Sequence, residues 1–265
     1  MEIWHYAFFW KALAAGVALG VSAGPAGVFL ILRRDSLLPH ALTHVAFVGV
    51  ALGFLLRGAP LALALAVTVA AAFAVMEIRE RAGIYEDTAV GILAGLGLAL
   101  AVVLASLARS YDVRLLTYLF GNILVVTREE TLLALGLLVV TLAVLHRFRE
   151  ALLFVSFDEE SARAAGLSVK TLKLLLATLT ALLVVIGMRM VGLLLVSALM
   201  VIPGAAALEV ARSFRQCLWL SGLFGGISVA GGLAVSVTLD LPPSGAIVLF
   251  SGLLFLLCLF ARRVK

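Results

Sequence analysis

The feature that most constrains this chain is a series of long apolar blocks, each bounded by charges, proline or glycine. The blocks fall near residues 8–32, 40–56, 60–76, 88–108, 131–147, 172–188, 190–208, 217–239 and 244–261. At about 1.5 Å of rise per residue, most of these blocks would cross a hydrocarbon core of about 30 Å as helices, although the second and third are short. We therefore expect an all-α, polytopic transmembrane helix bundle of about eight or nine spanning helices, with nine as the working count. The stretch 115–126 is too short to span and leaves that count open by one.

A bilayer must cover these blocks, because the chain has too few charges for a water-soluble exterior. Of its 265 residues, 64% are hydrophobic and 13% are charged, against about 45–50% and about 25% in soluble domains. Basic residues come singly or in pairs between apolar blocks, which argues against a nucleic-acid-binding face. The N-terminus lacks the features of a cleaved signal. We expect one transmembrane domain, residues 1–265, embedded in a lipid bilayer.

The distribution of lysine and arginine predicts the orientation. If the N-terminus is outside, alternate loops place 14 of the 20 Lys and Arg residues on the cytoplasmic side and 6 outside. Cytoplasmic loops of membrane proteins carry an excess of basic residues. We therefore expect an N-out, C-in arrangement, which requires an odd number of spans.

Glycines at four-residue spacing in several blocks predict close helix packing. The sets are Gly16, Gly20 and Gly24; Gly49 and Gly53; Gly91 and Gly95; and Gly222 and Gly226. Such spacing lines small residues along one helical face, where two backbones can approach closely. We expect these faces to pack within the chain or, for some of them, against a partner subunit.

The longest polar insertion, residues 155–170, predicts a short helix on the cytoplasmic side between the fifth and sixth spans. Ser156 can cap a helix whose first turn holds Asp158, Glu159 and Glu160, and Gly166 can end it. The alternative is a solvated connector with no specific role.

Two histidines, His40 and His44, are the strongest candidates for metal binding. Residues four apart on a helix share a face, so two imidazoles can hold one ion, and imidazole suits Zn²⁺ and similar divalent cations. Ionisable groups within an apolar block usually face a bundle interior or a pathway. The alternative is that either histidine only hydrogen-bonds a neighbouring helix.

The depth of this pair is open at the level of sequence. Pro39 is acceptable in a helix's first turn and so places His40 near the start of its helix. Either the ion is held deep along a pathway, or the first helix is interrupted at residues 24–27 (Gly-Pro-Ala-Gly) and leaves the second helix starting well inside the bundle.

Other polar or flexible positions are weaker candidates. Asp87, at the start of the block 88–108, is either a functional acid or a helix cap. Pro203 and Gly204 interrupt the block 190–208 and can hinge a gate, although membrane helices tolerate both residues. The methionines Met188, Met190 and Met200 are expected to fill the core rather than bind metal.

Six segments, in order along the chain, resemble the membrane permeases of the zinc, manganese and iron branch of the ATP-binding-cassette importers. They are RRDSLLPHALTHVAFVGVALG (33–53), DTAVG (87–91), YLFGN (118–122), SFDEESARAAG (156–166), VGLLLVSALMVIPGAA (191–206) and LPPSGAIV (241–248). Glu160, Ser161 and Ala162, followed by Gly166, are similar to the EAA-x3-G loop by which such subunits dock onto their ATPase. The resemblance implies a homodimer of this chain, two cytoplasmic ATP-binding subunits, an extracytoplasmic metal-binding protein and no permanently bound cofactor.

The chain departs from this family at the histidine pair. The family pattern resembles Gly-Asp-Ala-x-Ser-His, whereas this chain has Pro39, His40 and Thr43 at the Gly, Asp and Ser positions, and His44 matches. A charged oxygen ligand has thus become a neutral nitrogen. Since carboxylate suits Mn²⁺ and imidazole suits Zn²⁺, we expect zinc to be favoured over manganese as the transported ion.

These observations favour the permease subunit of an ATP-driven divalent metal importer, with zinc as the expected cargo and manganese or iron as the alternative. The chain has no G-x-x-x-x-G-K-[ST] phosphate loop, so a partner must hydrolyse ATP. An intramembrane metalloenzyme is a second alternative, but His-Ala-Leu-Thr-His lacks the glutamate that H-E-x-x-H uses as a base. A carrier driven by an ion gradient is a third, but it would need buried carboxylates, and almost all acids here lie at expected helix ends.

Overall fold

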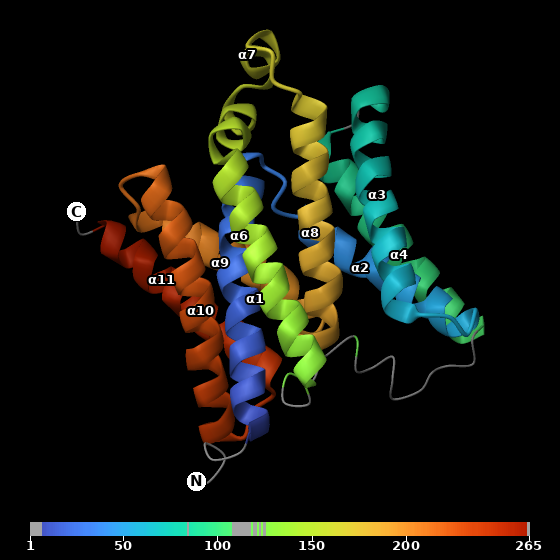
Figure 1. Cartoon of the computed structure of the whole chain (residues 1–265), viewed down its shortest axis with the longest axis vertical. Coiled ribbons are helices and arrows are strands. Elements are labelled where there is room, and N and C mark those ends of the chain that lie inside the picture. The colour runs from blue at the N-terminus through green and yellow to red at the C-terminus, as the bar shows by residue number, and fades with distance from the viewer. Residues whose placement is uncertain are drawn as a thin grey trace.

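All regular elements in the described part of the chain are helical. The structure is a computed structural model that describes residues 7–83, 85–107, 118, 121, 123 and 126–263. Its helices are α1 (Ala7–Leu32), α2 (Leu38–Leu55), α3 (Pro60–Ala82), α4 (Glu86–Leu107), α6 (Arg128–Phe157), α7 (Glu159–Ala164), α8 (Val169–Val191), α9 (Leu193–Val210), α10 (Phe214–Leu239) and α11 (Pro243–Arg263), as Figure 1 shows.

Within these residues, nine helices are long and apolar enough to cross a membrane. They correspond one to one with the nine apolar blocks of the sequence, which confirms the expected helical bundle. The shorter helix, α7, lies between the fifth and sixth of them, where a cytoplasmic helix was expected. The stretch 115–126 falls largely outside the described residues.

Two helices extend especially far beyond the C-terminal ends of their apolar blocks. Helix α3 continues past residue 76 to Ala82, where an ion pair one turn apart, Arg81 to Glu77 at 2.8 Å, supports a polar last turn. Helix α6 has 30 residues and continues well past residue 147 to Phe157. The apolar blocks correspond only to the part of each helix that meets lipid, so they do not include these two polar extensions.

Helix α1 runs through the middle of the bundle and is largely buried (Figure 1). Two of its three glycines at four-residue spacing, Gly20 and Gly24, lie against the backbone of α10, as their spacing predicted, and Gly27 lies against α9. A Cβ atom at Gly20 would lie 2.5 Å from the carbonyl oxygen of Gly225 in α10, and one at Gly27 would overlap the carbonyl oxygen of Met200 in α9. These close approaches hold α9 and α10 directly against α1.

Helices α2, α3 and α4 group together at one side of the bundle (Figure 1). Gly49 and Gly53 of α2 lie against the backbone of Ala64 and Pro60 in α3, so this pair also packs within the chain. The glycines of α4 behave differently. A Cβ atom at Gly91 or at Gly95 would meet nothing within 4 Å in the described structure.

The interruption expected at Pro203 is wrong, and the interruption at residues 24–27, left open by the sequence as one of two alternatives, is absent. Helix α1 passes through Pro25 and α9 passes through Pro203, each as one continuous helix. Gly204 packs closely on α1, since a Cβ atom there would lie 3.2 Å from the backbone nitrogen of Val28. Packing against a neighbouring helix lets a membrane helix tolerate proline without breaking. A gating role for Pro203 and Gly204 stays a prediction.

The ends of α6 and α8 that lie opposite α7 are joined by a glutamate. The Glu130 carboxylate accepts a hydrogen bond from the backbone nitrogen of Thr127 at 2.8 Å, completing a capping box at the start of α6. It also pairs with Arg189 in the last turn of α8 at 2.6 Å. Beyond Arg189, α8 passes into α9 through Gly192 alone, whose φ of 87° and ψ of 162° only glycine adopts readily.

The interior of the bundle is filled by aliphatic side chains and methionine. Met188 and Met200 are fully buried and Met190 is 2% exposed. The three methionines therefore fill the core, as expected. Exposed leucine, isoleucine and valine side chains are frequent on α4, α6 and α11, which suits helices whose outer faces meet lipid.

Candidate functional site

His40 and His44 come together on α2 as their spacing predicts. Their Nε2 atoms are 3.3 Å apart, and the two rings meet edge to face with centroids 4.7 Å apart. His40 is exposed and His44 is half-buried. One turn of helix is enough to bring the two nitrogens together, with no contribution from another element.

This separation suits two ligands of one tetrahedral ion. Two Zn–N bonds of about 2.0–2.1 Å that meet at the tetrahedral angle place their nitrogens about 3.3–3.4 Å apart. The two histidines would then supply two of the four ligands of a tetrahedral ion. The described residues contain no group of three or more His, Cys, Asp or Glu side chains that could hold a metal.

The surroundings of the pair are mostly backbone and apolar. The Nδ1 atom of His44 is buried and has no hydrogen-bond partner in the described structure. The Thr43 hydroxyl donates to the carbonyl oxygen of His40 at 2.6 Å and so is already engaged. Gly97 of α4 lies beside the His44 backbone, with its Cβ position 3.4 Å from the His44 carbonyl carbon. Helix α4 therefore covers one side of the pair.

The depth of the pair follows from where α2 begins. In Figure 1 the connection from α1 descends before α2 starts, so α2 begins lower in the view than the ends of α3 and α8 that lie nearest α7. Helix α1 is uninterrupted, so an interruption is not what produces this depth. The connection itself brings the start of α2 inward.

That connection holds a buried ion cluster that sequence reasoning missed. The Asp35 carboxylate pairs with Arg79 of α3 at 2.6 Å and with Arg33 at 3.5 Å, and the Asp35 side chain is only 4% exposed. One signal was present in the sequence, namely an acid that follows two arginines and precedes an apolar helix. It could not identify Arg79, which lies 44 residues away.

Helix α7 forms where the polar insertion predicted it, but its cap is different. Asp158, not Ser156, is the N-cap, and its carboxylate accepts a hydrogen bond from the backbone nitrogen of Ser161 at 3.0 Å. Ser156 lies inside α6 because that helix extends to Phe157, and its hydroxyl donates to the carbonyl oxygen of Leu152. The expected cap at Ser156 is therefore wrong.

Gly166 ends α7 as expected. Its φ of 85° is left-handed. Its backbone nitrogen donates a hydrogen bond to the carbonyl oxygen of Arg163, and the backbone nitrogen of Leu167 donates one to the carbonyl oxygen of Ala162. These two bonds form a Schellman motif, which favours glycine at this position.

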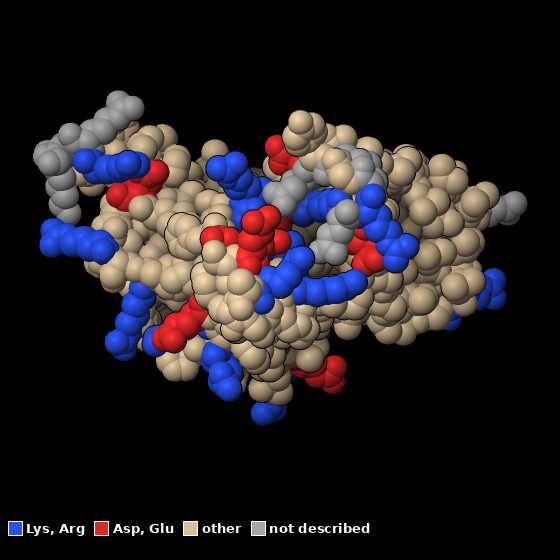
Figure 2. Space-filling view, turned by 90° about the horizontal axis from the view of Figure 1, so that it is seen from above, with Lys and Arg blue, Asp and Glu red and all other residues tan. Residues whose placement is uncertain are grey.

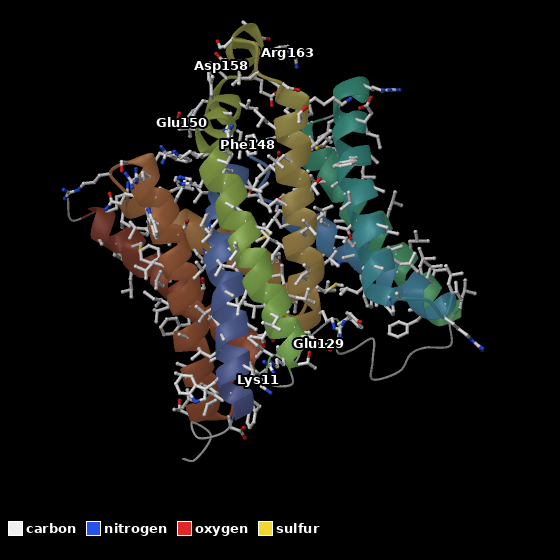
Figure 3. The ribbon with its side chains drawn as sticks, in the orientation of Figure 1. Lys11, Glu129, Phe148, Glu150, Asp158 and Arg163 are labelled. Atoms are coloured by element: carbon white, nitrogen blue, oxygen red, sulfur yellow. The ribbon has the colours of Figure 1, made fainter. Side chains whose placement is uncertain are left out.

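The surface of α7 is polar and exposed, apart from one anchoring side. Ala162 is fully buried, whereas Asp158, Glu160 and Gly166 are exposed. Glu159 pairs with Lys173 of α8 at 2.6 Å. Figure 3 places Asp158 and Arg163 at the extreme end of the molecule. Helix α7 is thus a small protruding knob, held by Ala162 and Glu159.

Asp158 stays charged near neutral pH. Hydrogen bonds from the hydroxyl and the backbone N–H of Ser161 hold the pKa of its carboxyl below the ordinary value. A lowered pKa means that the cap is strongest above the ordinary aspartate range and is lost only as pH falls through the lowered value.

The face that carries α7 is rich in basic side chains. Figure 2, viewed from this end, shows lysine and arginine gathered around the middle of the face, with acids among them. Basic residues occur at the end of α3, at the end of α7 and at the start of α8: Arg79, Arg81, Arg163, Lys170 and Lys173. The distribution matches the basic side expected from the loops.

The remaining candidates lie apart from the histidines in sequence and in helix. Asp87 is exposed in the first turn of α4, within the helix rather than before it, where its charge complements the helix dipole. Pro203 and Gly204 are buried in α9. None of the three joins the histidines in a cluster of metal-binding side chains within the described residues.

The match to a family model identifies the class of protein as a membrane permease of the ATP-binding-cassette systems. The sequence matches the ABC 3 transport family over residues 5–262, and the chain belongs to that family. It is a multi-pass protein of the plasma membrane and a transport subunit, and the ATPase of such systems is a separate subunit.

Individual relatives are metal-transport permeases. The manganese transport system membrane protein MntC of Halalkalibacterium halodurans is 33% identical over 98% of this chain and 89% of its own length. The high-affinity zinc uptake system membrane protein ZnuB of Haemophilus influenzae is 31% identical over 97% of this chain and 99% of its own. The chain is thus a permease of the metal-importing kind.

Solved structures show the same fold. The structure described as PsaBC from Streptococcus pneumoniae in complex with Fab matches with a TM-score of 0.86 and 33% identity, over 97% of this chain and 92% of that one. An inward-facing, putative metal-chelate type ABC transporter matches with a TM-score of 0.75 at 19% identity, over 98% of this chain and 88% of that one.

Proposed function

We propose that this chain is the permease subunit of an ATP-driven zinc importer. In this proposal two copies form the pathway, two cytoplasmic ATP-binding subunits drive it, and an extracytoplasmic protein delivers the ion. His40 and His44 bind the ion in transit, and α7 is the contact through which the ATPase moves the permease. The N-terminus lies outside and the C-terminus inside.

The 3.3 Å separation of the two Nε2 atoms is the observation that carries the proposal. It suits a tetrahedral ion bound by two imidazoles. Water or backbone carbonyls complete the coordination, which leaves the ion held by only two protein side chains. A site for a passing ion has to release it, so a partial ligand set is an advantage here.

Zinc is favoured over manganese by the chemistry of the ligands. Both histidines offer neutral nitrogen, and the described residues add no carboxylate to them. Nitrogen ligands suit Zn²⁺, and carboxylate oxygens suit Mn²⁺. Manganese remains the second candidate, because several relatives at 33–34% identity are named as manganese transport proteins.

The test is uptake by vesicles that contain the chain with its ATPase and binding protein, with zinc, manganese and iron supplied separately. We expect zinc to be imported fastest. Replacing both histidines (His40→Ala and His44→Ala) should lower zinc uptake by at least about tenfold, because the only paired ligands are lost. His146, exposed on α6, provides the matched control, and His146→Ala should leave uptake unchanged. Unchanged zinc uptake in the double variant would refute the site.

The role of α7 has a separate test. Gly166→Val places a β-branched residue at a φ of 85° and should disrupt the end of α7, and Glu160→Lys reverses an exposed charge. Each should weaken co-purification of the ATPase while the permease itself remains folded. Gly136→Val, on the open face of α6, is the control for a bulky residue at a glycine. Full ATPase binding by both variants would contradict the assignment.

A further inference from the structure

Three ion pairs connect α7 with the segment that leads into the histidine pair. Glu159 of α7 pairs with Lys173 of α8 at 2.6 Å. Lys170, one turn earlier on α8, pairs with Glu77 of α3 at 2.9 Å. Arg79, two residues further along α3, pairs with Asp35 at 2.6 Å. Each pair joins a different element to the next.

The pair nearest the histidines is the most buried of the three. The exposed fractions are 42% and 14% for Glu159 and Lys173, 63% and 39% for Lys170 and Glu77, and 11% and 4% for Arg79 and Asp35. Exposed ion pairs contribute little individually and are screened by salt. Breaking a buried pair by neutralising one partner is costly, because the other charge is left uncompensated. The Asp35–Arg79 pair is therefore the one of the three ion pairs whose disruption should cost the most.

Asp35 controls where α2 begins. Its carbonyl oxygen accepts a hydrogen bond from the backbone nitrogen of Leu38, the first residue of α2, at 3.0 Å. Its own nitrogen donates to the carbonyl oxygen of Leu30 at 2.8 Å, which closes the end of α1. The residue therefore fixes the corner between the two helices, and its side chain fastens that corner to α3. His40 lies in the first turn of α2, directly after this corner.

We propose that Asp35 and Arg79 are positioning residues that hold His40 and His44 in place and transmit displacement of α7 to them through Glu77, Lys170, Lys173 and Glu159. The proposal rests on the proposed function, since it concerns the same ion site and the same ATPase contact. Neither residue touches the ion. Because the links are arranged one after another, breaking any one of them interrupts the connection.

The experiment uses the complete importer in vesicles, with Zn²⁺ as the probe, and measures ions imported per ATP hydrolysed. Asp35→Asn keeps the shape of the side chain and removes its charge. We expect the Asp35→Asn variant to hydrolyse ATP at a rate within about twofold of the unmodified importer. The number of ions imported per ATP hydrolysed should fall about tenfold, which lies within the range for residues that couple two sites. Asp35→Glu, which keeps the charge, should restore most of the ratio. Glu209→Gln, which removes an exposed pair with Arg262 elsewhere in the bundle, is the control and should not change it.

A combination of variants separates transmission from general stability. Links in series give no further loss once one is broken, so Asp35→Asn with Lys173→Gln should have the ratio of Asp35→Asn alone. Independent effects would multiply instead. If Asp35→Asn does not assemble, Lys170→Gln and Lys173→Gln on the surface of α8 provide the same comparison, and their losses should not multiply.

An unchanged ratio in Asp35→Asn, or losses that multiply in either pair of variants, would overturn the inference. That result differs from a failure of the proposed function. If zinc uptake by the original protein did not depend on His40 and His44, the ion site itself would be wrong. If uptake depends on them and the ratio is insensitive to Asp35, only the transmission is wrong.

Discussion

At the residue scale, the side chain at position 40 would decide how much charge the proposed site offers to a passing ion. His40 and His44 are neutral ligands, and the nearest acid along the chain, Asp35, is engaged by Arg33 and Arg79. An ion held by the two imidazoles therefore keeps its full charge. Such a site binds through directional nitrogen ligation rather than charge compensation, which favours Zn²⁺ over a harder ion.

Replacing His40 with aspartate should shift the preference toward manganese. His40→Asp introduces a carboxylate oxygen beside the His44 nitrogen, and we expect the ratio of manganese to zinc uptake to rise by about tenfold. Uptake of both ions by reconstituted vesicles measures the change. His40→Asn, which adds an oxygen without charge, is the control and should shift the ratio less. Equal shifts in both variants would show that charge is not the cause.

The histidine pair could be predicted from sequence because it depends on one turn of one helix. The Asp35–Arg79 pair could not, because it depends on how α3 packs against the α1–α2 corner. Ser156 illustrates a different limit. Its suitability as a cap was correct chemistry, but α6 continues past it, and Asp158 two residues later becomes the cap. Local preference identifies candidates, and the length of the preceding helix selects among them.

At the scale of elements, glycine spacing predicted which helices could pack closely but not which helices would. Gly20, Gly24 and Gly49 lie against backbone of another helix, whereas Gly91 and Gly95 of α4 meet nothing within the described chain. The four-residue spacing is the same in both cases. Contact depends on where α4 lies in the bundle, which no local pattern records.

The two kinds of glycine should respond differently to alanine. Gly27→Ala places a methyl group on the carbonyl oxygen of Met200, and we expect a loss of about 1–3 kcal/mol of stability, the usual cost of overpacking. Gly91→Ala, at an open position in α4, should be neutral or slightly stabilising. Thermal unfolding of the detergent-solubilised chain compares them. Equal losses at both sites would contradict the packing of α1 on α9.

At the scale of the molecule, the order of the nine helices that are long and apolar enough to span, among the described residues, could be predicted from hydropathy, because each span must be apolar to enter lipid. Continuity through Pro25 and Pro203 could not, because neighbouring helices stabilise those helices from outside. The orientation rests on the basic residues around α7. Figure 3 places Arg163 at that end and Lys11 at the opposite end.

Orientation is testable by labelling single cysteines in intact cells. Cys217 and Cys258 are first replaced with serine, and Arg163→Cys or Lys11→Cys is then introduced. With the basic face inside, a membrane-impermeant maleimide should label Lys11→Cys at least about tenfold more than Arg163→Cys. Opening the cells should make the two labels comparable. Strong labelling of Arg163→Cys in intact cells would reverse the orientation.

Glu130 both caps the start of α6 and pairs with Arg189 of α8, so it connects these two helices at the end opposite α7. The two helices are joined through α7 at one end and by the Glu130–Arg189 pair at the other. Because α6 and α8 are connected at both ends, we expect them to tilt together rather than to separate. Since α6 has 30 residues, or about 45 Å, a tilt of about 10° would swing its far end by about 8 Å. A displacement at one end of this pair would thus reach its other end instead of being absorbed between the two helices.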